Sequence, residues 1–257
     1  MEIKNSKAIV TGGGSGLGAA TANFLVQAGA EVALLDVDDK RGKSTADRLG
    51  NRAHFFHLNV ADHNQVDKVI EEINQRFGGF NVVINCAGIG GSARIVSKEG
   101  IVAHEWFTNI LDVNLVGTFN IIRATAPILM TNTPNNEGEK GVYINTSSIA
   151  AQDGQVGQAA YSASKGGIVS MTLTLAREFA QEGIRVMTIL PGIMDTPLLG
   201  KLSEKVRERL SKQVPFPPRL GRPEEFASLV VHIIENPYLN GECIRLDGGL
   251  RMGFGRK

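Results

Sequence analysis

Cysteine is scarce in this sequence, with only Cys86 and Cys243 among 257 residues. Two cysteines are too few for a disulfide framework and are typical of a reducing compartment. An excess of one charge is also lacking, because 27 Lys and Arg residues are balanced by 26 Asp and Glu residues, for a net charge of +1. A chain without a basic field is not expected to bind nucleic acid.

Long apolar runs and metal-binding spacings are missing as well. No apolar run approaches the roughly 20 residues that a membrane helix needs, and an apolar strand pattern by Lys7 leaves no room for a signal peptide. The histidines form no metal spacing with cysteine or acidic partners, so we predict no metal site. They are His54, His57, His63, His104 and His232. We expect a soluble intracellular protein without membrane contact, cytoplasmic or, in a eukaryote, in the mitochondrial matrix.

The sequence does contain a regular alternation of short apolar runs with helical patterns. Strands are expected at residues 7–10, 31–35, 53–59, 80–85, 141–147, 184–190 and 242–246. A helix is expected to open from the glycine-rich turn 11–18 and to run to about residue 28, and further helices are expected at residues 39–49, 64–77, 105–130, 159–181 and 223–235. This rhythm predicts one Rossmann-like α/β domain over residues 1–257, a doubly wound parallel sheet of about seven strands with helices on both faces. Residues 88–100 and 132–140 are rich in Gly, Ser, Asn and charge and are expected to be loops.

A glycine-rich turn follows the first predicted strand. Gly12, Gly16 and Gly18 permit a tight turn, a close approach of the backbone to a pyrophosphate, and close packing of helix on strand. Asp36 ends the second strand, where a carboxylate accepts hydrogen bonds from ribose hydroxyls and repels a 2′-phosphate. Neither Val37 nor Ser15 is basic, so the sequence favours NAD over NADP.

A tyrosine and a lysine are spaced for joint chemistry. Tyr161 and Lys165 are one helical turn apart, so their side chains share one face. Bringing a phenol from a pKa of ~10 to about 7 requires roughly 4 kcal/mol, and a cation about 4 Å away contributes an energy of that order. Ser148, after the apolar run 142–144, is placed to donate a hydrogen bond to the same substrate oxygen.

Together these motifs resemble the short-chain dehydrogenase/reductase family over essentially the whole chain. The resemblance rests on the glycine turn 11–18, the run 85–88, Asn114, Ser148 and the run 161–165. It implies a catalytic set of Asn114, Ser148, Tyr161 and Lys165. It also implies a set of cofactor-binding residues: Gly12, Ser15, Gly16, Leu17, Gly18, Asp36, Asn59, Val60, Cys86, Ala87, Gly88, Tyr161, Lys165, Pro191, Met194 and Thr196.

Two positions depart from that family's pattern. Cys86 stands where an asparagine is usual, and we expect it to be a small apolar side chain beside the cofactor, with a redox role as the alternative. Asn59 stands where an aspartate usually contacts the adenine amino group, and its side-chain carbonyl can still accept that hydrogen bond.

A closer resemblance is to the type II 3-hydroxyacyl-CoA dehydrogenases, which also oxidise some hydroxysteroids. Residues 154–165, 191–199, 213–221 and 234–249 are similar to that group. The resemblance implies NAD-linked oxidation of short or 2-methyl-branched 3-hydroxyacyl-CoA thioesters in fatty acid metabolism, by a homotetramer. Residues 193–222 are expected to form a flap over the substrate. Arg94 and Lys98 are either contacts for a CoA phosphate or two solvated charges.

The mechanism implied by these residues is a hydride transfer from a secondary alcohol. Ser148 and Tyr161 bind the hydroxyl, the Tyr161 phenolate removes its proton, and hydride passes to NAD⁺. Lys165 lowers the tyrosine pKa and binds the ribose, while Asn114 holds a relay water. The alternatives are a 3-oxoacyl-carrier-protein reductase, a hydroxysteroid dehydrogenase, and a non-catalytic scaffold or RNA-processing partner.

Overall fold

A seven-stranded parallel sheet forms the centre of the protein. The computed structural model describes residues 1–200 and 202–254. The strands are β1 (Lys7–Thr11), β2 (Glu31–Asp36), β3 (Ala53–His57), β4 (Val82–Asn85), β7 (Gly141–Thr146), β8 (Ile184–Pro191) and β9 (Cys243–Leu246). Their order is β3-β2-β1-β4-β7-β8-β9, so the chain reverses direction across the sheet between β1 and β4. In such sheets ligands bind at this reversal, beyond the carboxyl ends of the strands.

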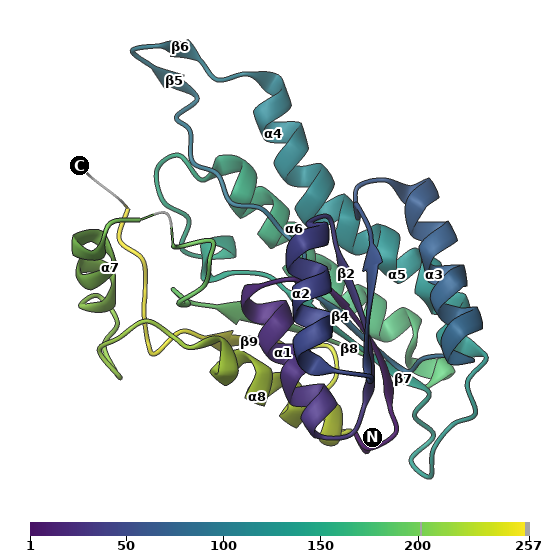
Figure 1. Ribbon diagram of the computed structural model, residues 1–257. Helices are drawn as coiled ribbons and strands as arrows, with labels where there is room; N and C mark the ends of the chain where they lie inside the picture. Colours follow the sequence, from purple (N-terminus) through teal and green to yellow (C-terminus); the bar gives the residue numbers. More distant parts are fainter. Residues whose placement is uncertain (201, 255–257) are drawn as a thin grey trace.

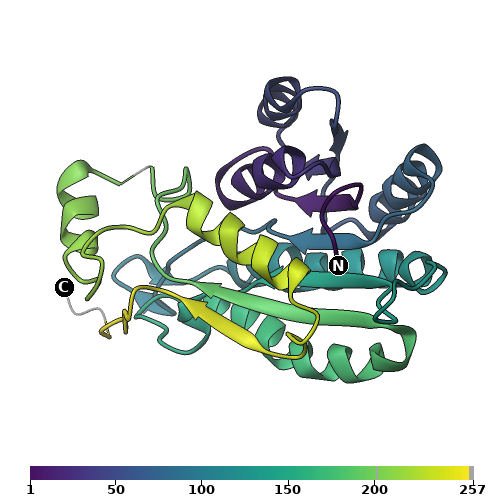
Figure 2. The same cartoon turned by 90° about the horizontal axis from the view of Figure 1, so that it is seen from below.

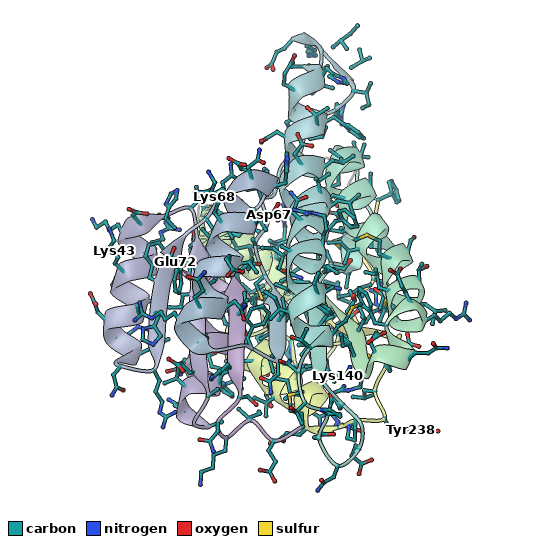
Figure 3. The ribbon with its side chains drawn as sticks, turned by 90° about the vertical axis from the view of Figure 1, so that its right-hand side faces the viewer. Lys43, Asp67, Lys68, Glu72, Lys140 and Tyr238 are labelled. Carbon is teal, nitrogen blue, oxygen red and sulfur yellow. The ribbon has the colours of Figure 1, made fainter. Side chains whose placement is uncertain are left out.

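Helices cover both faces of the sheet, as Figures 1 and 2 show. One face packs against α1 (Gly16–Gln27), α2 (Asp39–Leu49) and α8 (Pro223–Glu235). The other face packs against α3 (His63–Phe77), α5 (Gly117–Met130) and α6 (Ala159–Glu178). Charged side chains such as Lys43 of α2 and Lys68 of α3 lie on the outer surface (Figure 3). The predicted doubly wound α/β fold is confirmed.

The central strands carry apolar side chains on both faces because both faces of the sheet are covered. In β1, Ala8 and Val10 pack into the layer beneath α1 and α8, while Ile9 packs into the layer beneath α3 and α5. All three side chains are completely buried. The continuous apolar runs in the sequence therefore correspond to strands buried on both sides, as a parallel sheet requires.

Two predicted segments differ from the structure. The predicted loop 88–100 contains a short hairpin, in which β5 (Val96–Ser97) pairs antiparallel with β6 (Gly100–Ile101), and this hairpin projects at the top of Figure 1. The single helix expected at residues 105–130 is divided into α4 (His104–Leu111), a π-helical turn (Asp112–Val116) and α5. π-Helical turns inside longer helices are often found at functional sites.

Smaller differences occur at the ends of elements. Strand β3 stops two residues before the predicted end at 59, because Asn59 and Val60 belong to the loop that leads to α3. Helix α6 ends at Glu178, and a short 3₁₀ turn, Ala180–Glu182, precedes β8. Such shifts of one to three residues at the ends of elements do not alter the topology.

Within the described residues, one continuous helical segment is long and apolar enough to cross a membrane. It spans His104–Met130, has 27 residues and a mean hydropathy of 1.3, and half of its apolar window is buried inside the protein. The sequence pattern predicted no such segment. A core helix of a folded protein passes the same test, so this segment is weak evidence for a membrane span.

The predicted flap over residues 193–222 contains the helix α7 (Glu204–Ser211), which lies beside the yellow segment that follows β9 in Figure 1. Arg207 of α7 forms an ion pair with Asp195, its Nη2 lying 2.5 Å from Oδ1. This contact joins α7 to the turn that follows β8. Lys201 of the predicted flap and residues 255–257 of the predicted domain lie outside the described residues.

Candidate active site

A cavity of about 990 Å³ opens at the carboxyl ends of the strands. Its walls come from the ends of β1, β2, β4, β7 and β8 and from the first turns of α1 and α6. All of the predicted cofactor-binding residues line it, and so do Ser148, Tyr161 and Lys165. The cavity therefore lies where the order of the strands reverses, and it brings together motifs from the whole length of the chain.

The glycine turn between β1 and α1 is shaped for close backbone approach. Gly12 and Gly16 adopt φ values of +64° and +52°, which side-chain-bearing residues rarely adopt. A Cβ at Gly18 would lie 2.3 Å from the carbonyl oxygen of Gly12, so only glycine lets α1 pack this closely on β1. Backbone amides at the start of α1 can thus face a pyrophosphate directly, and this cradle fits a dinucleotide.

Asp36 is held rigidly at the end of β2. Its Oδ2 accepts a hydrogen bond from Gly14 N at 2.9 Å, and its Oδ1 accepts one from Asp38 N at 2.9 Å. The carboxylate lines the cavity in this fixed orientation. Arg41 was not predicted from the sequence. It also lines this end of the cavity, and its Nε pairs with Asp38 Oδ2 at 3.3 Å. Its position in the first turn of α2, beside Asp36, was the available signal.

Ser148, Tyr161 and Lys165 meet at the other end of the cavity. Ser148 follows β7 and caps a 3₁₀ turn, its Oγ accepting a hydrogen bond from Ala150 N at 3.1 Å. A side-chain hydrogen bond joins Ser148 to Tyr161. The Nζ of Lys165 donates to the carbonyl oxygen of Thr146 at 2.8 Å and lies 5.9 Å from the centroid of the Tyr161 ring. A hydroxyl pair and a buried amine therefore surround one end of the cavity.

Burial dominates the pKa values in this end of the cavity. It raises the pKa of Tyr161, and the hydrogen bond from Ser148 opposes that shift. It also lowers the pKa of Lys165 from 10.5 to about 8 and raises the pKa of the Cys86 thiol to about 11. Cys86 therefore remains a neutral thiol near neutral pH, in keeping with the expected apolar side chain.

The raised pKa of Tyr161 differs from the sequence prediction. That prediction gave Lys165 the task of lowering the tyrosine pKa, but in the structure the Lys165 ammonium is directed to Thr146 O and burial determines the shift. A neutral phenol of this kind donates a proton to a ketone oxygen. Accepting a proton from an alcohol requires the phenolate, which becomes more populated as pH rises.

Asn114 lies in the π-helical turn and is completely buried behind the cavity. Its Oδ1 accepts a hydrogen bond from Ile89 N at 2.8 Å, and its Nδ2 donates to Ile89 O at 3.0 Å and to Ser164 Oγ at 3.1 Å. The side chain thus braces the loop after β4, part of which lines the cavity. Its role as the holder of a relay water stays a prediction.

Asn59 lines the cavity at the same end as Asp36, and its Oδ1 accepts a hydrogen bond from Ala61 N at 3.1 Å. A carbonyl oxygen has a second lone pair, so this atom retains the capacity to accept a hydrogen bond from an adenine amino group.

The predicted loop 88–100 reaches the cavity at one end only. Gly90 and Gly91 line the cavity, whereas Arg94 and Lys98 are exposed, Arg94 just before the hairpin and Lys98 within it. No group of three or more potential metal-ligating side chains occurs within residues 1–200 and 202–254.

The doubly wound sheet and the glycine turn before α1 are typical of dinucleotide binding. Together with a serine, a tyrosine and a lysine where the strand order reverses, they define a dinucleotide-binding oxidoreductase. Residues 6–207 match the family model described as short chain dehydrogenase. The chain therefore belongs to the short-chain dehydrogenase family, as its motifs predicted.

Relatives over the full length of the chain agree with this assignment. The chain is 52% identical to human 3-hydroxyacyl-CoA dehydrogenase type-2 over 252 residues, which cover 97% of each protein. It is 34% identical to a 3-oxoacyl-carrier-protein reductase of Thermotoga maritima, over 97% of this chain and 99% of that protein. Among solved structures, 3-hydroxyacyl-CoA dehydrogenase type-2 of Mycobacterium avium superimposes with a TM-score of 0.92 at 39% identity, covering 98% of both chains.

Proposed function

We propose that the protein is an NAD-dependent 3-hydroxyacyl-CoA dehydrogenase that interconverts a 3-hydroxyacyl-CoA and its 3-oxoacyl-CoA. The observation that carries the proposal is the 52% identity to the human type-2 enzyme over 97% of both chains. The presence of Ser148, Tyr161 and Lys165 in one cavity supports it, because a non-catalytic scaffold has no need of such a set. The lower identity of 34% to a carrier-protein reductase makes that activity the second candidate.

In the proposed reaction the chain's own residues bind the alcohol and move its proton. Ser148 and Tyr161, already hydrogen-bonded to each other, both contact the substrate oxygen. Tyr161 takes the hydroxyl proton during oxidation and returns it during reduction. When bound, NAD supplies the hydride acceptor. The buried Lys165 supplies a positive charge near the tyrosine and the ribose, and Asn114 holds the loop after β4 in place.

The choice of NAD over NADP is part of the proposal. The carboxylate of Asp36 is fixed by two backbone amides, and a 2′-phosphate placed there would meet a negative charge that cannot turn away. The wild type should therefore prefer NAD strongly, and Asp36→Ala should narrow the preference chiefly by weakening NAD binding. Kinetics with both cofactors test this, with Asp47→Ala on the exposed face of α2 as the control. Equal use of both cofactors by the wild type would favour the carrier-protein reductase.

The substrate is tested by a direct comparison of alcohols with NAD⁺. Binding energy from the remote CoA group orients the reacting carbon, so the thioester should react more efficiently than its truncated acid. We expect 3-hydroxybutyryl-CoA or its 2-methyl analogue to give a kcat/KM at least about tenfold above that of free 3-hydroxybutyrate or a hydroxysteroid. A better rate with the steroid or the free acid would remove the acyl-CoA assignment and leave the oxidoreductase assignment in place.

We further propose that the protein is a cytoplasmic or mitochondrial homotetramer. Support for self-association comes from large apolar side chains exposed on neighbouring helical segments, namely Val116 at 41%, Phe119 at 46% and Leu173 at 46%. Val116 ends the π-helical turn, Phe119 lies in the first turn of α5, and Leu173 lies on α6, which packs against the π-helical turn. Apolar groups gathered in this way commonly mark a surface of association.

A further inference from the structure

The segment after β9 crosses the end of the cavity that holds Ser148 and Tyr161. The chain turns at Gly248 and Gly249, whose φ values of +62° and +82° favour glycine, and then places Leu250 in a small apolar cluster. Leu250 is 2% exposed and packs with Ile149, the residue after Ser148. Met252 packs against the same cluster and lines the cavity. Figure 1 shows this C-terminal segment in yellow, running past α7.

Arg245, in β9, fastens the C-terminal segment to the loop after Ser148. Its Nε donates to Asp247 Oδ2 at 2.8 Å and its Nη1 to Gln152 Oε1 at 2.6 Å. Its Nη2 donates to Asp153 Oδ2 at 2.7 Å and to Leu250 O at 2.9 Å. The side chains of Arg245, Asp153 and Asp247 are only 16%, 17% and 8% exposed. A planar guanidinium with several satisfied donors in a largely buried position fixes the relative geometry of its partners.

Further hydrogen bonds continue this connection toward the chain terminus. Gln155 Nε2 donates to Gly253 O at 2.8 Å, and Val156 N donates to Phe254 O at 3.4 Å. The pKa of the Asp153 carboxyl is held below its ordinary value first by Arg245 and, more weakly, by the backbone N–H of Met252. Asp153 is therefore bonded to Arg245 and lies close to the backbone of Met252. The loop 152–156 and the segment 250–254 run together as one unit.

We propose that Met252 is a specificity-determining residue whose side chain limits the length of the alkyl group beside the reacting carbon, and that Arg245 and Asp153 are positioning residues that hold it there. This inference rests on the proposed oxidation of a 3-hydroxyacyl-CoA. Met252 is suited to the task because an unbranched thioether is apolar and adapts its shape to a flexible alkyl chain. Its neighbours in the apolar cluster, Ile149 and Ile193, also line the cavity, so an alkyl group would meet a continuous apolar wall.

The first test changes the size of the side chain at this wall. One methylene in an apolar pocket changes kcat/KM by roughly 10-fold to 200-fold. Met252→Ala should therefore raise the ratio of kcat/KM for 3-hydroxydecanoyl-CoA over 3-hydroxybutyryl-CoA by roughly tenfold, and Met252→Phe should lower it. Met130→Ala removes the same side chain from the other face of the sheet and should leave the ratio unchanged. An unchanged ratio in both Met252 variants would overturn the proposal.

The second test separates positioning from folding. Asp153→Asn keeps the shape of the side chain and weakens its hold on Arg245 and Met252, so KM for the alcohol should rise several-fold with little change in the dissociation constant of NAD. Arg245→Lys keeps the charge but loses the planar guanidinium with its several N–H donors, so it should also raise KM for the alcohol. Equal losses of NAD and alcohol binding in both variants would show a merely structural role.

Failure of the proposed function can be told apart from failure of this inference. If the wild type oxidises no 3-hydroxyacyl-CoA, the same Met252 variants are compared on straight-chain 2-alkanols of increasing length with NAD⁺. A shift in length preference on the alkanols supports the role of Met252 as an apolar wall without the thioester. If the length preference of the Met252 variants equals that of the wild type on every series that the protein oxidises, the proposed role of Met252 is contradicted.

Discussion

Tyr161 is the group on which proton transfer depends in the proposed reaction. Replacing it with Phe keeps the buried ring and removes the hydroxyl that is hydrogen-bonded to Ser148. We expect Tyr161→Phe to lower kcat by on the order of 10² or more, because general acid–base catalysis typically contributes that much. NAD binding, measured by fluorescence titration, should remain within about twofold. Near-normal turnover in this variant would show that another group carries the proton.

The raised pKa of Tyr161 also predicts how the two reaction directions respond to pH. Because burial favours the neutral phenol, the phenolate that accepts a proton grows in population only as pH rises toward that pKa. The kcat/KM for alcohol oxidation should rise about tenfold per pH unit through the neutral range, whereas ketone reduction should stay flat or fall. Initial rates measured in both directions from about pH 6 to about pH 9 check this. A flat oxidation profile would mean that bound NAD or Lys165 has already lowered the tyrosine pKa below neutrality.

Lys165 makes stability depend on pH in a direction that can be worked out. Burial lowers its pKa from 10.5 to about 8, so below pH 8 the folded protein carries a buried charge that the unfolded chain solvates. That penalty disappears as pH rises from about 8 to 10.5, so the wild type should gain stability over this range relative to Lys165→Met. Between about pH 7 and about pH 9.5 the expected gain is about 2 kcal/mol. Urea unfolding of both proteins measures it, and a constant difference would place the Lys165 pKa near its ordinary value.

Some site residues could be predicted from sequence, and others could not, for a physical reason. Tyr161 and Lys165 are one turn apart on a single helix, and Asp36 ends a strand, so local periodicity is enough to place them. Met252 and Asp153 are brought together only by folding, through hydrogen bonds that span 92 residues between Asp153 and Arg245. No local pattern marks such pairs. The partners of Asn114 were missed for the same reason.

At the scale of single elements, the turn into α1 depends on the absence of a side chain at Gly18. A Cβ there would lie 2.3 Å from Gly12 O and 2.8 Å from Gly12 C, which are backbone atoms that cannot rotate away. Gly18→Ala should therefore push α1 from β1, cost about 1–3 kcal/mol of stability and weaken NAD binding at least about tenfold. Chemical denaturation and NAD titration check both effects. Gln27→Ala, at the exposed end of the same helix, should stay within about 0.5 kcal/mol of the wild type, and an equally stable Gly18→Ala protein would contradict the argument.

The elements that the sequence did not predict are those whose signals are too short or too subtle. Strands β5 and β6 have two residues each, fewer than any alternation needs, and they lie in a stretch rich in Gly, Ser and charge. The π-helical turn at Asp112–Val116 adds one residue to a turn, which the 3.6-residue pattern of the flanking helices hides. Helices with clear end signals were predicted closely, since α2 and α8 have the expected bounds.

At the scale of the whole molecule, the proposed homotetramer can be tested at Phe119. This side chain is 46% exposed and lies near Val116 on the same helical face, so a second copy meeting this surface about a two-fold axis would bury both. Phe119→Glu would then place two carboxylates against each other in an apolar contact, where unpaired charges cost several kcal/mol. We expect sedimentation velocity to show a species of about four times 27.6 kDa for the wild type and smaller species for Phe119→Glu. Phe119→Leu keeps an apolar surface and should remain assembled. If the wild type sediments as a single chain at micromolar concentration, the tetramer is excluded. If Phe119→Glu assembles as the wild type does, the interface lies on another face of the molecule.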